Sequence, residues 1–267
     1  MDAFIQNKLF QAAQYVEQLG YYPVFVAIHG SQNYGLEIFT EEYQSDYDYK
    51  CIVLPTLQDL VKNSKPVSFV VKYEDGQIDI KDIRIFMETL LKMNPSYLEI
   101  LFTPYSVFLS EGHRLGRMKE LLPYLMEERG SLFAKAVYGM FLEKEKAMCH
   151  LYPTTAYKIE RYGYDGKQTH HMYRLLLMLR DFEKTGTMIL HPPESEVQFL
   201  IDLKLNRYPV EKALVMVDQW KLELYEIRLR LEDKYKNVKS DAANRMIDMS
   251  RSAVFSFCCT EKGRSLK

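Results

Sequence analysis

Two aspartates with a spacing suited to metal binding stand just before an apolar run. Asp46 and Asp48 are two positions apart and precede the run Cys51-Ile52-Val53-Leu54. Residues i and i+2 of a β-strand point to the same face, so both carboxylates would be directed at one place. Two such anions repel each other unless a hard cation lies between them, and Mg²⁺ prefers one or two carboxylates together with substrate phosphates. The spacing therefore predicts a site for Mg²⁺, or for Mn²⁺ as the alternative ion, at Asp46 and Asp48.

A glycine–serine pair upstream of the aspartates is a second feature that suits phosphate chemistry. Gly30 and Ser31 follow the apolar run at 24–28, and Ser31 lies fifteen residues before Asp46. Backbone N–H groups at a turn of this kind, where a helix begins, suit phosphate oxygens. Ser31 also suits the N-cap of that helix, and a capping hydroxyl and a phosphate ligand occupy the same place. We expect Gly30 and Ser31 to bind the phosphates of a nucleotide.

A third carboxylate is expected if the first two bind a catalytic metal. The segment 77–82 supplies Asp79 and Asp82 on a predicted strand. Asp79 lies between two isoleucines and faces away from the side that they bury, whereas Asp82 lies at the strand end, where it could cap the next helix instead. Asp79 is favoured as the third metal ligand and catalytic residue, with Asp82 as the alternative. Asp46, Asp48 and Asp79 would then support phosphoryl transfer, which relies on positioning and charge neutralisation.

The elements that must position these residues alternate between strand and helix in the first part of the chain. Apolar alternation predicts strands at 24–29, 47–54, 67–73 and 77–83. Helical periodicity predicts helices at 2–19, 32–38, 56–63, 85–93, 112–128, 131–150, 168–184, 194–204, 210–235 and 240–252. The outline is an α/β half followed by a helical half, and two halves of that kind usually leave a cleft that binds a ligand.

One segment of the helical half carries basic residues at helical spacing. If a helix begins near residue 167, one of its faces carries Lys167, His170 or His171, and Arg174. Three potential cations along one face could meet the triphosphate of a nucleotide across the cleft. The alternative is a charged helix face that is exposed to solvent.

Four segments, in order along the chain, resemble a known superfamily. They are His-Gly-Ser-Gln-Asn-Tyr-Gly-Leu (29–36), Ser-Asp-Tyr-Asp-Tyr (45–49), Lys-Met-Asn-Pro-Ser-Tyr-Leu-Glu-Ile-Leu-Phe (92–102) and Gly-Tyr-Asp-Gly-Lys-Gln-Thr-His-His-Met-Tyr-Arg-Leu-Leu (163–176). Together they resemble the DNA polymerase β-type nucleotidyltransferases, and more narrowly the RNA-ligase-associated polymerase-like group of bacteria and phages. The resemblance covers about residues 24–180. The spacing between Ser31 and Asp46 departs from the family pattern through an apparent insertion around 37–44.

The resemblance implies a fold and a set of site residues. The fold class would be α+β, with a nucleotidyltransferase-type mixed sheet and flanking helices in a catalytic domain at 1–110. An all-helical domain at 111–267 would complete the nucleotide cleft. An NTP would be the donor, and the metal would bind at Asp46 and Asp48. The charged residues that recur in the helical segment of the family correspond here to Asp165, Lys167, His171 and Arg174.

The expected activity is magnesium-dependent transfer of a nucleoside monophosphate from an NTP to an acceptor hydroxyl or phosphate. The 3′ end of RNA or tRNA fits the resemblance as the acceptor. Two alternatives remain open: nucleotidylation of a protein or a small molecule, and nucleotide binding by a catalytically inactive module. In the second case Asp46 and Asp48 would be solvated carboxylates. His29, Asn94 and Glu99 are interpreted as structural or supporting residues.

The bulk composition excludes few classes of function. The formal net charge is −1, from 35 basic and 36 acidic residues, so the whole chain has no general attraction to nucleic acid, although a local basic patch remains open. The four cysteines show no C-x-x-C spacing, which favours reduced thiols and a cytoplasmic location. We expect no signal peptide and no membrane span, because the N-terminus lacks the pattern of a leader and no apolar stretch reaches ~18 residues.

Overall fold

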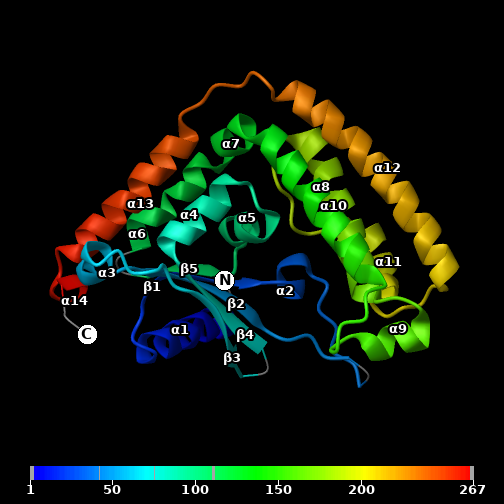
Figure 1. The fold of residues 1–267 in the computed structure, drawn as a ribbon, viewed down its shortest axis with the longest axis horizontal. Coiled ribbons are helices and arrows are strands. Elements are labelled where there is room, and N and C mark those ends of the chain that lie inside the picture. Colours follow the sequence, from blue (N-terminus) through cyan, green and yellow to red (C-terminus); the bar gives the residue numbers. More distant parts are fainter. Residues whose placement is uncertain (1–2, 42, 75, 110–111, 265–267) are drawn as a thin grey trace. The chain divides into compact units, whose positions relative to one another are not determined.

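The protein folds into two compact units (Figure 1). The computed structural model describes residues 3–41, 43–74, 76–109 and 112–264. The sheet unit consists of the described residues up to Glu128 together with those from Lys239 onward. The helical unit consists of the residues between them, Arg129–Val238.

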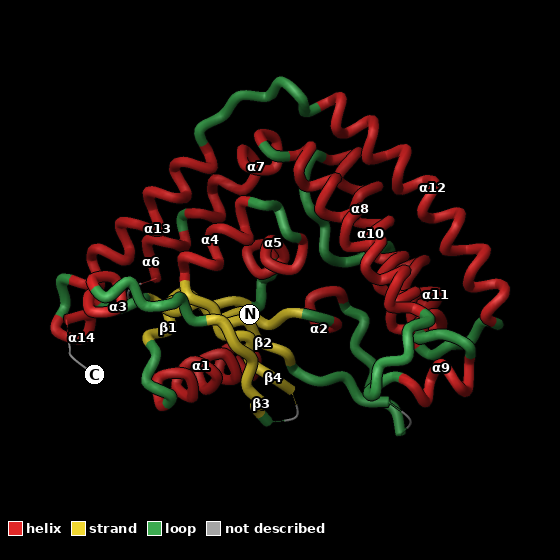
Figure 2. Tube along the Cα trace, in the orientation of Figure 1, coloured by secondary structure: helices red, strands yellow, loops and turns green. Residues whose placement is uncertain are grey.

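A five-stranded mixed sheet forms the centre of the sheet unit (Figure 2). In spatial order its strands are β3 (Ser68–Tyr73), β4 (Gly76–Asp82), β2 (Asp48–Leu54), β1 (Tyr22–His29) and β5 (Ser106–Phe108). β2 and β4 run parallel, and the other neighbouring pairs are antiparallel. All four predicted strands are confirmed. β5 has no counterpart among them, because a three-residue strand is too short to show an alternation pattern.

Helices cover both faces of this sheet. α1 packs on β1 and β2, and its buried Leu9 and Val16 share a core with Ile78 and Ile80 of β4. Asp79, between the two isoleucines, therefore points to the opposite face, where α4 and α5 lie. The helices of the sheet unit are α1 (Ala3–Gln18), α2 (Ser31–Tyr34), α3 (Leu57–Val61), α4 (Ile83–Leu91), α5 (Pro95–Phe102), α6 (His113–Gly116), α7 (Met118–Glu128), α13 (Ala242–Cys258) and α14 (Glu261–Arg264).

The last two helices of the chain belong to the sheet unit. α13 packs against α4, α6 and α7, and α14 packs against α13 and α3. Phe257 of α13 contacts Tyr22 of β1, with ring centroids 4.9 Å apart. These contacts explain why the compact units are not divided in the same way as the expected domains at 1–110 and 111–267. A change in local pattern near residue 110 contains no information about a helix that returns from the far end of the chain.

The helical unit consists of five helices, of which α10 is the central one. α10 packs against α8, α11 and α12, and most of its side chains are buried. The five helices are α8 (Gly130–Met148), α9 (Ala156–Tyr162), α10 (Gly166–Thr185), α11 (Glu194–Lys204) and α12 (Val210–Lys234). The expected α+β class, a mixed sheet with flanking helices followed by a helical region, is confirmed. Over the described ranges, no helix has the length and apolarity that a membrane span requires.

Candidate active site

The turn that joins β1 to α2 lies beside the first residue of β2. Gly30, in this turn, has φ = 91° and ψ = −149°, a conformation that residues with a side chain rarely adopt. A Cβ atom placed on Gly30 would lie 4.0 Å from Oδ2 of Asp48. His29, the last residue of β1, is the register partner of Asp48. The structure thus brings together the glycine turn and one of the two aspartates predicted to bind metal.

The second of these aspartates is placed by a hydrogen bond from α2. Nε2 of Gln32 donates to the backbone oxygen of Asp46 at 2.6 Å. The side chain of Asp46 is exposed and that of Asp48 is half-buried, so both carboxylates are accessible to a ligand. Ser31 is half-buried at the start of α2, but Gly30 occupies the N-cap position. The expected capping role of Ser31 is therefore wrong, and its predicted role as a phosphate ligand stays a prediction.

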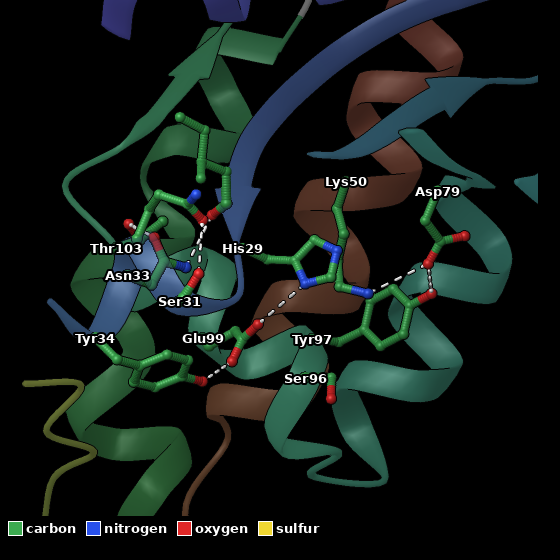
Figure 3. Close-up of polar contacts among 12 residues, drawn as sticks. His29, Ser31, Asn33, Tyr34, Lys50, Asp79, Ser96, Tyr97, Glu99 and Thr103 are labelled. Atoms are coloured by element: carbon green, nitrogen blue, oxygen red, sulfur yellow. Dashed lines mark hydrogen bonds and ion pairs between the residues drawn. The ribbon is translucent and has the colours of Figure 1, made fainter. Parts of the chain in front are cut away.

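Asp79 lies in an ionic network with Lys50 and Tyr97 (Figure 3). Its Oδ2 accepts hydrogen bonds from Nζ of Lys50 at 3.2 Å and from the Tyr97 hydroxyl at 2.9 Å. Its Oδ1 lies 3.3 Å from Nζ of Lys81. Lys50 is buried, and its ammonium lies 4.3 Å from the centre of the Tyr97 ring. Burial by itself raises the pKa of Asp79, but the two lysines and the Tyr97 hydroxyl outweigh burial, so the pKa is lowered.

The three carboxylates predicted to share a metal do not form one group. The strand register pairs Asp79 with a lysine of β2 rather than with Asp48. Within the described part of the chain, no three His, Cys, Asp or Glu side chains come together as a metal-binding group. Asp82 accepts a hydrogen bond from the backbone N–H of Arg84 at 2.8 Å and pairs with its guanidinium at 2.6 Å, so it caps α4. Asp79 and Asp82 are thus engaged by cationic side chains, whereas Asp46 is exposed and Asp48 is half-buried beside the glycine turn.

A second polar network surrounds the glycine turn (Figure 3). Glu99 of α5 is buried, and its Oε1 lies 3.6 Å from Nδ1 of His29. The other oxygen, Oε2, accepts a hydrogen bond from the Tyr34 hydroxyl. Sequence reasoning interpreted His29 and Glu99 as structural and gave Tyr34 no role. A signal for Glu99 was present, because it is the one charged residue in the otherwise apolar or aromatic run 97–102.

The basic residues predicted to share a helix face lie on α10, in the helical unit. Lys167 is exposed, whereas His171 and Arg174 are half-buried. Burial, the neighbouring His170 and three lysines hold the pKa of His171 well below 6.5. His171 is therefore neutral at pH 7 and is not one of the expected cations. Burial lowers the pKa of Arg174 to about 9, so its guanidinium remains protonated at pH 7.

Two other residues of this segment have structural roles. The Asp165 side chain caps α10 and pairs with Lys158 at 3.0 Å. His170 is buried, and its Nδ1 lies 2.9 Å from the backbone oxygen of Leu200. Burial lowers the pKa of His170 to about 4. Of the two histidines that the sequence left open, His171 is the one with partial exposure.

Comparison with known proteins places the chain in a family. Its sequence matches the RNA repair pathway DNA polymerase beta family over residues 3–247. The chain belongs to this family. Membership of the RNA repair pathway DNA polymerase beta family confirms the resemblance to polymerase β-type nucleotidyltransferases. The matched range includes every residue predicted for the site, from Gly30 to Arg174.

The other comparisons add little to the family assignment. No curated protein matches the chain. Among solved structures, a nucleotidyltransferase-like protein from Exiguobacterium sibiricum 255-15 is 12% identical, with a TM-score of 0.32. The similarity covers 91% of this chain and 78% of the other. The RNA repair pathway DNA polymerase beta family is therefore the relation on which the functional argument rests.

Proposed function

We propose that this protein is a divalent-cation-dependent nucleotidyltransferase that transfers a nucleoside monophosphate from an NTP to an acceptor hydroxyl or phosphate. Membership of a polymerase β-type family supports nucleotidyl transfer. The observation that carries the proposal is the position of Gly30, whose missing Cβ would lie 4.0 Å from Oδ2 of Asp48. This arrangement puts a backbone that phosphates can approach closely next to a carboxylate that can bind their counter-ion.

The residues present fit a cation that shares its ligands with a nucleotide. Mg²⁺ is usually bound through one or two carboxylates plus substrate phosphates, and Asp46 and Asp48 are an accessible pair of this kind. When bound, Mg²⁺ or Mn²⁺ would neutralise phosphate charge and make the acceptor hydroxyl easier to deprotonate. The Gly30–Ser31 turn would orient the β- and γ-phosphates, so that the leaving pyrophosphate stays next to the turn. Phosphate binding by Lys167 and Arg174 remains a prediction.

RNA is the acceptor that we favour. The matched family is described as belonging to an RNA repair pathway, and the 3′ end of RNA or tRNA supplies a suitable hydroxyl. A formal net charge of −1 argues against a large nucleic-acid footprint, but a short 3′ end requires few phosphate contacts. A protein side chain or a small molecule is the alternative acceptor, and an inactive nucleotide-binding module is the alternative function.

The test is a labelling experiment with each of the four α-³²P-labelled NTPs, in Mg²⁺ or Mn²⁺, on total RNA and on a cell lysate. We expect label on RNA together with release of pyrophosphate. Asp48→Asn should lower the rate by a factor on the order of 100 or more, the scale for losing one charge-stabilising group. Asp59→Asn is the matched control, because Asp59 belongs to the capping box of α3.

Each other outcome has a definite meaning. Label on protein or on a small molecule would replace RNA as the acceptor and leave the transfer reaction in place. Nucleotide binding without pyrophosphate release would favour the inactive module. Full activity of the Asp48→Asn variant would refute the proposed site.

A further inference from the structure

A buried carboxylate connects the two ends of the glycine turn. Glu99 is 4% exposed, and its two oxygens contact different residues. Oε1 lies 3.6 Å from Nδ1 of His29, the last residue of β1. Oε2 accepts a hydrogen bond from the hydroxyl of Tyr34, the last residue of α2. One side chain of α5 therefore contacts the residue before the turn and the residue that ends the helix after it; we call this set of three residues the Glu99 bridge (Figure 3).

A second polar contact fixes the same turn from α5. Nδ2 of Asn33 donates to the backbone oxygen of Ile28 at 2.8 Å. Oγ1 of Thr103, the C-cap residue of α5, donates to Oδ1 of Asn33 at 2.7 Å. Asn33 and Thr103 are 0% and 1% exposed, so solvent does not compete for these bonds. The turn is thus connected to α5 at two separate places, both of which are polar and buried.

The turn depends on such contacts because of its own backbone. Gly30, at φ = 91°, lacks the side chain that would restrict its conformation, and glycine samples more conformations than any other residue. A phosphate-binding turn must be held to within about 0.5 Å of its productive geometry to be effective. Burying a carboxylate has a large desolvation cost. Hydrogen bonds are directional and apolar contacts are not, so buried polar groups are suited to fix the backbone geometry of such a turn.

We infer that Glu99 is a positioning residue, which acts through His29 and Tyr34 to hold the Gly30–Ser31 turn in the conformation that binds the β- and γ-phosphates of the nucleotide. The inference rests on the proposed function. In that proposed function, the Gly30–Ser31 turn binds the β- and γ-phosphates, which leave together as pyrophosphate. Loss of the Glu99 bridge should therefore weaken binding of the β- and γ-phosphates and leave binding of the α-phosphate unchanged.

The test measures binding of two probes by isothermal titration in Mg²⁺. Inorganic pyrophosphate carries the two phosphates without a base, and AMP carries the α-phosphate alone. Glu99→Gln should raise the Kd of pyrophosphate about tenfold or more, the scale for losing a supporting partner of a ligand-binding group, and should leave the Kd of AMP unchanged. In turnover, the KM for the NTP should rise by a similar factor, with a smaller change in kcat.

Two further variants separate positioning from general destabilisation. Tyr34→Phe removes one hydroxyl from the Glu99 bridge and should change pyrophosphate binding in the same direction, so it provides the test even if Glu99→Gln does not fold. Thr56→Ala removes a buried N-cap hydroxyl from α3, in the same unit, and should lower stability without changing pyrophosphate binding.

The outcomes distinguish this inference from the proposed function. If the wild-type protein binds neither pyrophosphate nor any NTP, the proposed function fails and the inference fails with it. If the wild-type protein binds pyrophosphate and both bridge variants bind it equally well, the inference alone is overturned. It is also overturned if Thr56→Ala weakens pyrophosphate binding as much as Glu99→Gln does.

Discussion

At the scale of single residues, two aspartates on neighbouring strands have opposite surroundings. Asp48 is half-buried and lies beside the glycine turn, where its carboxylate is accessible. Asp79 is opposite Lys50 in the register and is also close to Lys81 and Tyr97. A carboxylate with two ammonium groups within hydrogen-bonding or ion-pair distance is already neutralised. We therefore expect Asp48 to matter for activity and Asp79 to matter mainly for stability.

Replacing Asp79 by asparagine should destabilise the sheet unit by about 3 kcal/mol, because it leaves the buried Lys50 ammonium without its anion. Urea unfolding at pH 7 measures this loss. Glu88→Gln is the control, because it removes an exposed carboxylate paired with Lys92 and should change stability little. If Asp79→Asn instead abolished nucleotidyl transfer without affecting stability, the original prediction of a third metal ligand would be favoured.

The same pair predicts a pH dependence with a definite sign. Burial acts to raise the pKa of Asp79, but its cationic and hydroxyl neighbours lower it below the ordinary value of 3.8. A carboxyl group whose pKa is lower in the folded state stabilises the fold fully above its unfolded-state pKa. That contribution is lost as the pH falls through the folded-state value. The difference in stability between wild type and Asp79→Asn should therefore be constant near neutral pH and shrink below about pH 3.8.

At the scale of elements, the carboxylate of Asp82 at the end of β4 caps the N-terminus of α4. Asp82 is 2% exposed, accepts from the backbone N–H of Arg84 and pairs with its side chain. Asp82→Ala should lower stability by about 1–2 kcal/mol, because it removes the N-cap of α4. The rate of nucleotidyl transfer should stay within about twofold of wild type. Thermal unfolding and the labelling assay measure the two effects, and a large loss of rate at unchanged stability would restore Asp82 as a candidate metal ligand.

At the scale of the whole molecule, the sheet unit is built from both ends of the chain. Met246, Ala253 and Phe257 of α13 are buried in this unit, although they lie far from the sheet in sequence. Burying one large apolar side chain contributes about 1.5–3 kcal/mol, and a domain is typically stable by only about 5–15 kcal/mol. The C-terminal helices should therefore be indispensable to the sheet.

Deleting residues 239–267 should destabilise the sheet unit much more than the helical unit. Hydrogen exchange with mass spectrometry measures this, with the amides of β1 and β2 losing protection and those of α10 serving as the internal reference. A division of the chain into independent domains at 1–110 and 111–267 makes the opposite prediction, with α10 losing protection and the sheet keeping it.

The sequence by itself determined the four long strands, the longer helices and the face of β4 on which Asp79 lies, because alternation and helical periodicity are local properties of the chain. The shorter helices α5, α9 and α14 have no counterpart among the predicted helices. The motif at 29–36 likewise located the turn at Gly30, because a glycine and a serine between a strand and a helix are a local signal too. Only the tertiary structure decided which groups these side chains meet. The contact of Lys50 with Asp79 depends on the parallel register of β2 and β4, and the contacts of Glu99 join it to residues 65 and 70 positions away. Such pairings result from packing between distant segments, and a local pattern carries no information about them.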